Sequence, residues 1–194
     1  MARDRASRPE ATPLRLFVAI EIPADAKAAV SAVVEPWRRA FPKARWVPSD
    51  NWHVTLKFLG STWSRLVPWA EEAIGAAAVA AEPFETRVTG VGAFPGHGRA
   101  RVVWVGLDDA RGAMATLAGS LDAALAEEFE PEKRAFRAHL TVARSEPPMH
   151  LPEAFAETVL ESDPFRVDRL VLLQSYLCRP APRYEPVKTY GLGE

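Results

Sequence analysis

Apolar residues fall in short runs separated by more polar stretches, and their spacing predicts a mixture of strands and helices. Six runs rich in β-branched and aromatic residues predict strands, at 14–22, 52–58, 84–94, 101–107, 136–144 and 165–178. Alanine-rich or amphipathic stretches between them predict helices, at 23–41, 66–81, 110–129 and, with weaker periodicity, 152–160. The chain is therefore expected to be an α+β protein.

Prolines mark several of the predicted boundaries. Pro23 stands at the start of the first helix, where its missing N–H is not needed, and Pro36 is expected to kink or shorten that helix. A short extended piece is expected at 45–48, and a proline-rich extended tail from the last strand to Tyr190. Residues 1–13 are polar and predict a flexible tail.

The order of these elements repeats. Residues 14–94 have the pattern strand–helix–strand–helix–strand, and residues 101–178 have the same pattern. An internal repeat constrains a fold more than its separate elements do. We expect residues 14–194 to form one domain built from two related lobes, which suits the length of the chain.

The composition is that of an ordinary globular protein, and it narrows the classes of function. Hydrophobic residues make up 48% of the 194 residues, and 24 Lys and Arg against 25 Asp and Glu give a formal net charge of −1. These values exclude a disordered chain and a uniformly basic nucleic-acid-binding domain, but not a basic groove. The single cysteine, Cys178, is expected to pack inside the last strand, and it fits a reducing compartment.

Nothing in the chain predicts a secretory signal or a membrane span. Residues 1–13 lack the apolar core of a signal peptide, and the apolar run at 73–81 is much shorter than the ~20 residues needed to cross a bilayer. We therefore expect a cytoplasmic, monomeric protein that is not attached to a membrane.

The strongest candidate for chemistry is a His-x-Thr motif in the third element of each repeat. The two copies are His53 with Thr55 and His139 with Thr141. Side chains alternate along a strand, so each histidine points to the same face as its threonine, while the apolar residues beside them anchor the strand. Each strand therefore offers one imidazole and one hydroxyl on a shared polar face.

Two imidazoles brought face to face suit a phosphodiester reaction. With an unperturbed pKa near 6.5, one ring can be neutral and accept a proton while the other is charged and donates one. Each positioned acid or base contributes on the order of 10²–10⁴-fold, and the threonine hydroxyls can donate to phosphoryl oxygens. The chain contains no metal-binding motif, Walker loop or dinucleotide fingerprint, and we expect no metal and no cofactor.

The motifs also resemble those of a known family. HVTLKFLG at 53–60 and HLTVAR at 139–144 look like the two motifs of the 2H phosphoesterase superfamily. LRLFVAIEIPADAK at 14–27 and SYLCRPAPRYEPV at 175–187 are similar to the opening and closing segments of its RNA 2′,3′-cyclic phosphodiesterase branch, historically called 2′-5′ RNA ligases. The resemblance implies a bilobal, pseudo-twofold fold in which antiparallel sheets flank a central cleft and helices lie outside. It also implies metal-free hydrolysis of an RNA 2′,3′-cyclic phosphate end to a 2′-phosphomonoester.

The resemblance assigns roles to five residues. His53 would protonate the departing 3′ oxygen, and His139 would activate water. Thr55 and Thr141 would hold phosphoryl oxygens, and Arg144, which closes the second motif, would pair with the phosphate. Strict alternation from His139 puts Arg144 on the opposite face, so the strand must end or twist before it.

Several other residues have a structural explanation as well as a functional one. Lys57 shares the parity of His53 and could add positive potential to the cleft, but a solvated charge is the simpler expectation. Three aromatic residues could stack on a terminal base, although core packing is expected for each: Phe17, Trp46 and Trp52. His97 and His150 lack a threonine partner and are expected at the surface. Five arginines are candidates for a basic rim that receives the RNA backbone: Arg99, Arg101, Arg134, Arg137 and Arg179.

Three alternatives keep the same pair of histidines. The site could act on small nucleoside cyclic phosphates, or on 2′-5′ linkages, including their formation by the reverse reaction. In the third alternative, which is not an enzyme, the histidines only contact phosphate in a module that binds RNA ends. Turnover of RNA with a 2′,3′-cyclic phosphate end separates an enzyme from such a module.

Overall fold

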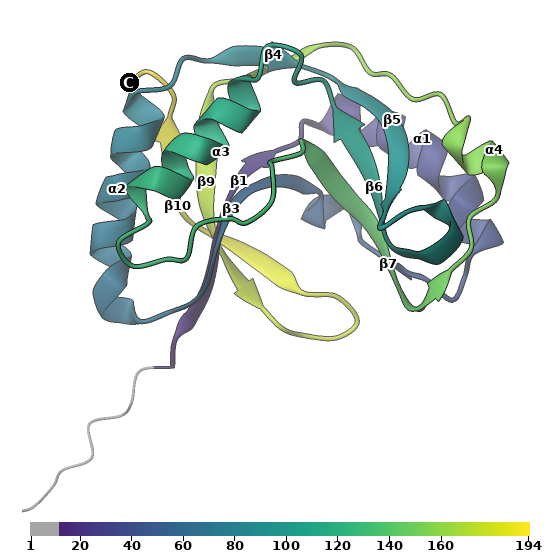
Figure 1. Ribbon diagram of the computed structural model, residues 1–194, viewed down its shortest axis with the longest axis horizontal. Coiled ribbons are helices and arrows are strands. Elements are labelled where there is room, and N and C mark those ends of the chain that lie inside the picture. The colour runs from purple at the N-terminus through teal and green to yellow at the C-terminus, as the bar shows by residue number, and fades with distance from the viewer. Residues whose placement is uncertain (1–11) are drawn as a thin grey trace, which may run out of the picture.

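A computed structural model describes residues 12–194 and shows a mixed α+β fold (Figure 1). The tail expected at residues 1–13 lies almost wholly outside the described residues. The strands are β1 (Leu14–Glu21), β2 (Arg45–Trp46), β3 (His53–Thr62), β4 (Phe84–Thr86), β5 (Val88–Phe94), β6 (Ala100–Leu107), β7 (His139–Met149), β8 (Phe165–Val167), β9 (Arg169–Tyr176) and β10 (Arg183–Gly191). The α-helices are α1 (Ala24–Ala40), α2 (Val67–Val79), α3 (Ala113–Ala124) and α4 (Glu153–Ala156), and short 3₁₀ turns are η1 (Ser49–Asn51), η2 (Ser64–Leu66) and η3 (His97–Arg99).

Most of the strands join one antiparallel sheet. Its order is β10-β9-β1-β3-β7-β6-β5, with β2 paired to β7 beside this path, while β4 and β8 form a separate two-stranded sheet. One residue pair, Val54 with Leu140, joins β3 to β7. The sheet therefore divides into a β3 side (β10, β9, β1 and β3) and a β7 side (β7, β6, β5 and β2). The α+β class with antiparallel pairing is confirmed, but the expected two sheets are the two sides of one continuous sheet.

Each side of the sheet takes strands from both of the predicted repeats. The repeats assign β5 to the first copy, yet β5 pairs with β6 on the β7 side. They assign β9 to the second copy, yet β9 pairs with β1 on the β3 side. Only residues 95–99 connect β5 to β6, and such a short antiparallel connection favours a hairpin.

The helices pack in two groups, one on the β3 side and one on the β7 side of the sheet (Figure 1). α2 and α3 contact each other and strands of the β3 side, while α4 contacts β5 on the β7 side. α1 meets α4 through the rings of Trp37 and Phe155, whose centroids are 5.2 Å apart. Pro36 lies inside α1 and does not shorten it, because the helix continues past Pro36 to Ala40.

The strand β1 is buried on both faces. Leu16 and Val18 belong to the main apolar core, together with residues of the helices. Phe17 and Ala19 point the other way and form a small second cluster with two apolar residues of β9. A strand buried on both faces carries a continuous apolar run, as the run at 14–22 predicted.

Three expectations for the C-terminal part are wrong. The segment expected to be an extended tail contains β10, which pairs with β9 along its length and so satisfies the backbone groups of that strand. The helix expected at 152–160 is only the four-residue α4. Cys178 is exposed, because β9 ends at Tyr176 and Cys178 lies in the loop that leads to β10.

Candidate active site

The two His-x-Thr motifs meet where β3 and β7 pair. The residues in the middle of the two motifs lie opposite each other in an antiparallel register. His53 therefore lies across from Thr141, and Thr55 lies across from His139. These four side chains are half-buried on one face of the sheet, whereas the apolar residues between them are fully buried. The structure thus brings both imidazoles and both hydroxyls together, with the histidines on one diagonal.

A β-bulge follows each motif. The residue directly after each threonine has no partner in the register, Leu56 on β3 next to β1 and Val142 on β7 next to β6. One extra residue of this kind reverses the alternation of the side chains beyond it. Residues 57 and 143 are accordingly buried, while residues 58 and 144 are exposed.

The bulge on β7 places Arg144 on the face of the histidines. The strand does not end before Arg144, because β7 continues to Met149. The positive charge of Arg144 contributes to the pKa of both histidines, after the larger effects of burial and a carbonyl contact. Arg144 is therefore close enough to both imidazoles to attract an anion that lies between them.

The bulge on β3 removes Lys57 from this face. Lys57 is only 1% exposed, and its ammonium group donates to Asp122 of α3 and to the carbonyl oxygen of Glu130 at 2.7 Å. Both expectations for Lys57, a solvated charge and a charge in the cleft, are wrong. Its ion pair instead links β3 to the segment that precedes β7, since Asp122 also accepts a hydrogen bond from the backbone N–H of Glu132.

Each imidazole is held by a main-chain carbonyl two residues earlier. His53 Nδ1 lies 2.8 Å from the carbonyl oxygen of Asn51, and His139 Nδ1 lies 2.7 Å from that of Arg137. A neutral imidazole that donates to a carbonyl carries its hydrogen on Nδ1, which leaves Nε2 as the basic atom. The sequence does not reveal these contacts, because a residue of any type can supply a carbonyl.

Burial is the largest cause of lowered pKa values at both histidines. The pKa of His53 falls from 6.5 to about 4, and that of His139 is also lowered. The carbonyl contacts raise both pKa values, the charge of Arg144 lowers both, and the charge of Lys27 lowers that of His53 further. Both rings are thus mainly neutral in the free protein at pH 7, and a bound anion would favour their charged forms.

Aromatic rings pack beside His53. The centroids of Phe17 and Tyr184 lie 4.8 and 5.2 Å from that of the imidazole. Phe17 is 3% exposed, so its packing role is confirmed and it offers no open face to a base. Sequence reasoning missed Tyr184, because the segment that forms β10 was expected to be an extended tail.

A second aromatic group packs beside His139. The centroid of the His139 ring lies 5.3 Å from that of Phe94 and 6.3 Å from that of Trp104. The Arg137 guanidinium lies over both aromatic rings, at 5.8 and 5.5 Å from their centroids. The indole fits flat on the sheet because Gly92 lies beneath it, where a Cβ would collide with the Trp104 ring.

The weaker candidates have mainly structural roles. Trp46 and Trp52 donate their indole N–H groups to nearby carbonyls, and Trp52 is 2% exposed. His150 is exposed, while His97 is half-buried against the ring of Phe155. The five arginines considered for a rim are all exposed, and one of them, Arg101, forms an ion pair with Glu146 at 3.0 Å.

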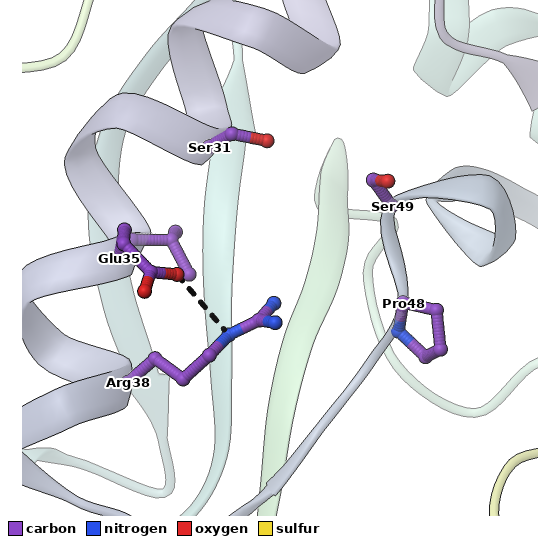
Figure 2. A pocket seen from close by; sticks show the side chains of 6 residues that line it. Ser31, Glu35, Arg38, Pro48 and Ser49 are labelled. Atoms are coloured by element: carbon purple, nitrogen blue, oxygen red, sulfur yellow. Dashed lines mark ion pairs between the residues drawn. The ribbon is translucent and has the colours of Figure 1, made fainter.

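Two hollows lie outside the histidine pair. One, of about 260 Å³, lies between α1 and the chain at the start of η1. Figure 2 shows its lining and the ion pair of Arg38 with Glu35, at 3.7 Å. A second, more open hollow of about 540 Å³ borders the far end of β3. Neither hollow is lined by a histidine, so the candidate site is identified by its converging side chains and not by a cavity.

Within residues 12–194, no group of three or more His, Cys, Asp or Glu side chains is placed to hold a metal ion. No helix in that range has both the length and the apolar character needed to span a membrane. The groups that converge at the site are two imidazoles, two hydroxyls and a guanidinium, which can exchange protons and bind an anion.

Comparisons with known proteins show the family to which the sequence is similar. The profile of the 2′-5′ RNA ligase superfamily matches residues 22–176. An RNA 2′,3′-cyclic phosphodiesterase of Aeropyrum pernix is 32% identical over 145 residues, which are 72% of this chain and 81% of that protein. One of Geobacillus stearothermophilus is 28% identical over 179 residues, 91% of this chain, which spans only 56% of that longer protein.

The fold is also similar to that of a solved structure. A crystal structure of E. coli LigT complexed with 3′-AMP aligns with a TM-score of 0.73 at 27% identity. The alignment covers 94% of this chain and 99% of LigT. The similarity therefore extends over both sides of the sheet.

Proposed function

The chain belongs to the 2′-5′ RNA ligase superfamily, and we propose that it is an RNA 2′,3′-cyclic phosphodiesterase, producing 2′-phosphomonoester ends. One observation carries the proposal: two imidazoles share one face, each held at Nδ1 by a carbonyl, with Nε2 left to exchange protons. The names of the two relatives support the same reaction. The 3′-AMP bound to LigT supports a nucleotide phosphate as the ligand of this fold.

In the proposed reaction, the two histidines move protons in opposite directions. His139 Nε2 accepts a proton from water as the water oxygen attacks phosphorus. The bond between phosphorus and the 3′ oxygen breaks, and Nε2–H of His53 gives its proton to that oxygen. One water is consumed, and the 2′ oxygen remains bonded to phosphorus. Proton exchange with solvent then restores both rings.

Three other side chains would stabilise the phosphoryl group. Thr55 and Thr141 lie across from the two histidines, so their hydroxyls would donate to the non-bridging oxygens. Arg144 would pair with the charge that these oxygens carry, because the bulge on β7 turns it to the same face. Each group then acts where negative charge develops in the transition state.

The low pKa of His53 sets a condition on this scheme. His53 is neutral in the free protein at pH 7, so its role as the acid requires that substrate binding raise its pKa. A cyclic phosphate is a monoanion, and between the rings it would offset the charges of Arg144 and Lys27. Substrate and proton are therefore expected to bind together.

We further propose that residues 14–194 form one domain of two lobes related by a pseudo-twofold axis near the β3–β7 pairing. The order β9-β1-β3 on one side corresponds to β5-β6-β7 on the other. The bulge after each motif and the carbonyl at each imidazole occur on both sides. Each lobe would contain one strand that belongs, by sequence, to the other repeat.

The first experiment measures turnover of an oligoribonucleotide with a 2′,3′-cyclic phosphate end in excess EDTA. We expect the wild type to form a 2′-phosphate, and His53→Ala or His139→Ala to lower kcat by at least about 10²-fold. His150→Ala is the matched control, because His150 is exposed and outside the site. Loss of activity in EDTA would overturn the metal-free mechanism. Unchanged activity in both variants would overturn the site, and binding without turnover would indicate an RNA-end-binding module.

A second experiment separates the acid from the base. A 2′,3′-cyclic substrate with sulfur in place of the 3′ oxygen has a leaving group that needs little protonation. The variant that lacks the acid should regain activity on this substrate, whereas the variant that lacks the base should not. We expect rescue of His53→Ala. Rescue of His139→Ala instead would exchange the two roles.

A further inference from the structure

The β9–β10 hairpin extends past the candidate site on the side of His53. Figure 1 shows it, in yellow, projecting beyond the rest of the sheet. Tyr184 on β10 lies beside the His53 ring, at 5.2 Å, and the next pair towards the turn is Arg183 with Tyr176. Residues 176–183, with the sequence YLCRPAPR, are called the hairpin tip below.

The hairpin tip is tied to the segment that orients His53. The side-chain amide of Asn51 donates to the carbonyl oxygen of Pro182 at 2.6 Å, while the main-chain carbonyl oxygen of Asn51 contacts His53 Nδ1. Arg183 lies 4.9 Å from the centroid of the Tyr176 ring and forms an ion pair with Glu185 at 3.1 Å. The tip therefore has a defined position next to the site.

The side chains of the hairpin tip combine positive charge with apolar surface. It contains two arginines and no carboxylate. Arg179 is exposed and forms no ion pair with a residue in the described range. Leu177 is 74% exposed, and Tyr176 is half-buried beneath Arg183. Arginine beside an aromatic side chain is a combination that binds single-stranded nucleic acid.

We propose that the hairpin tip binds the RNA strand on the 5′ side of its cyclic phosphate end, so that oligonucleotides are better substrates than mononucleotides. This inference rests on the proposed function. Arg179 and Arg183 would contact backbone phosphates, while Leu177 and Tyr176 would contact bases without reading their sequence. Continuity with His53 and the absence of Asp and Glu within residues 176–183 favour RNA over a protein as the occupant.

The test compares two substrates, a 2′,3′-cyclic mononucleotide and an RNA of about eight nucleotides with the same end, which is long enough for a single-strand site. The tip variant is Leu177→Ala with Arg179→Ala. The matched control is Val159→Ala with Arg166→Ala, which also removes one exposed apolar residue and one exposed arginine. Turnover of the mononucleotide, which would not reach the tip, reports on folding.

We expect the tip variant to lower kcat/KM for the RNA about tenfold, mainly through KM, and to leave mononucleotide turnover within about twofold. The slope of log(kcat/KM) for RNA against log salt should fall by about 0.7 for the lost phosphate contact. The control variant should change neither substrate. Equal effects of the tip variant on both substrates, or no effect on either, would overturn the proposal.

A binding assay separates this proposal from the proposed function. Fluorescence anisotropy with a labelled RNA that ends in a 2′-phosphate requires no turnover. If the wild type hydrolyses neither substrate, the proposed function fails. Weaker RNA binding by the tip variant than by the control would then still support the hairpin tip as an RNA contact. Equal binding by the two variants would refute it.

Discussion

The titration of His53 tests the candidate site without requiring turnover. Burial, the largest effect on this group, lowers its pKa from 6.5 to about 4. At 1.36 kcal/mol per pKa unit, charging His53 costs roughly 3 kcal/mol more in the folded protein than in the unfolded chain. We predict that His53 of the free protein stays neutral from pH 8 down to about pH 5, which is one unit above its lowered pKa.

Proton NMR of the imidazole Cε1–H signals measures this titration. The variants His53→Asn and His139→Asn assign the two signals of the site. The buffer must contain no phosphate, because an anion between the rings favours their charged forms. Adding inorganic phosphate as a probe should then raise the pKa of His53, and this increase should be smaller in Arg144→Gln, which attracts the anion less strongly.

The same shift predicts how stability depends on pH. Between pH 6.5 and about 4, the unfolded chain binds a proton at His53 that the folded protein does not bind. The free energy of unfolding should therefore fall as the pH falls through this range, by up to roughly 3 kcal/mol from this residue. Urea unfolding of the wild type and of His53→Asn measures the difference in slope. The reasoning is refuted by a His53 signal that titrates at pH 6.5 or above without phosphate, or by equal slopes.

Two further predictions concern packing around the site. Asp122→Ala leaves the buried ammonium of Lys57 without its carboxylate and should lower the free energy of unfolding in urea by about 3 kcal/mol. Lys57→Met removes the buried charge itself and should lower it clearly less. A larger loss in Lys57→Met than in Asp122→Ala would contradict this account. Gly92→Ala should lower stability by about 1–3 kcal/mol and reduce kcat, because Trp104 must move away from its place beside His139. Gly119→Ala is its control, with open space around the added Cβ on a helix, and should be neutral or stabilising by up to about 1 kcal/mol.

The sequence predicted most elements and brought out both motifs, but not the orientation of the residues beyond them. The wrong expectation for Lys57 and the conflict between strict alternation and the expected role of Arg144 have one cause. Counting alternate positions put Lys57 on the histidine face and Arg144 on the opposite face, whereas the bulges at Leu56 and Val142 exchange these assignments. Whether a strand bulges depends on its register with a neighbour, here β1 or β6, and that register is not encoded in the periodicity of one strand.

Other parts of the site depend on contacts between distant segments. Tyr184 reaches His53 only because β10 pairs with β9, and a proline-rich sequence gives little sign of such a strand. The carbonyls of Asn51 and Arg137 carry no side-chain signature at all. Local patterns therefore predicted the two histidines that we propose exchange protons, but not the groups that hold them.

The exchange of β5 and β9 between the repeats has a consequence for how the chain folds. β1 is among the first elements to leave the ribosome, yet one of its edges must wait for β9, which is among the last. A chain cut between residues 94 and 100 would give two fragments, each missing a strand that the other holds, so that neither could close its own sheet. We expect the two fragments to fold only together, with each fragment contributing a strand to the other's part of the sheet, as in a domain-swapped dimer. Completion of the histidine pair is thus tied to synthesis of nearly the whole chain, and we expect a truncated product to be unfolded.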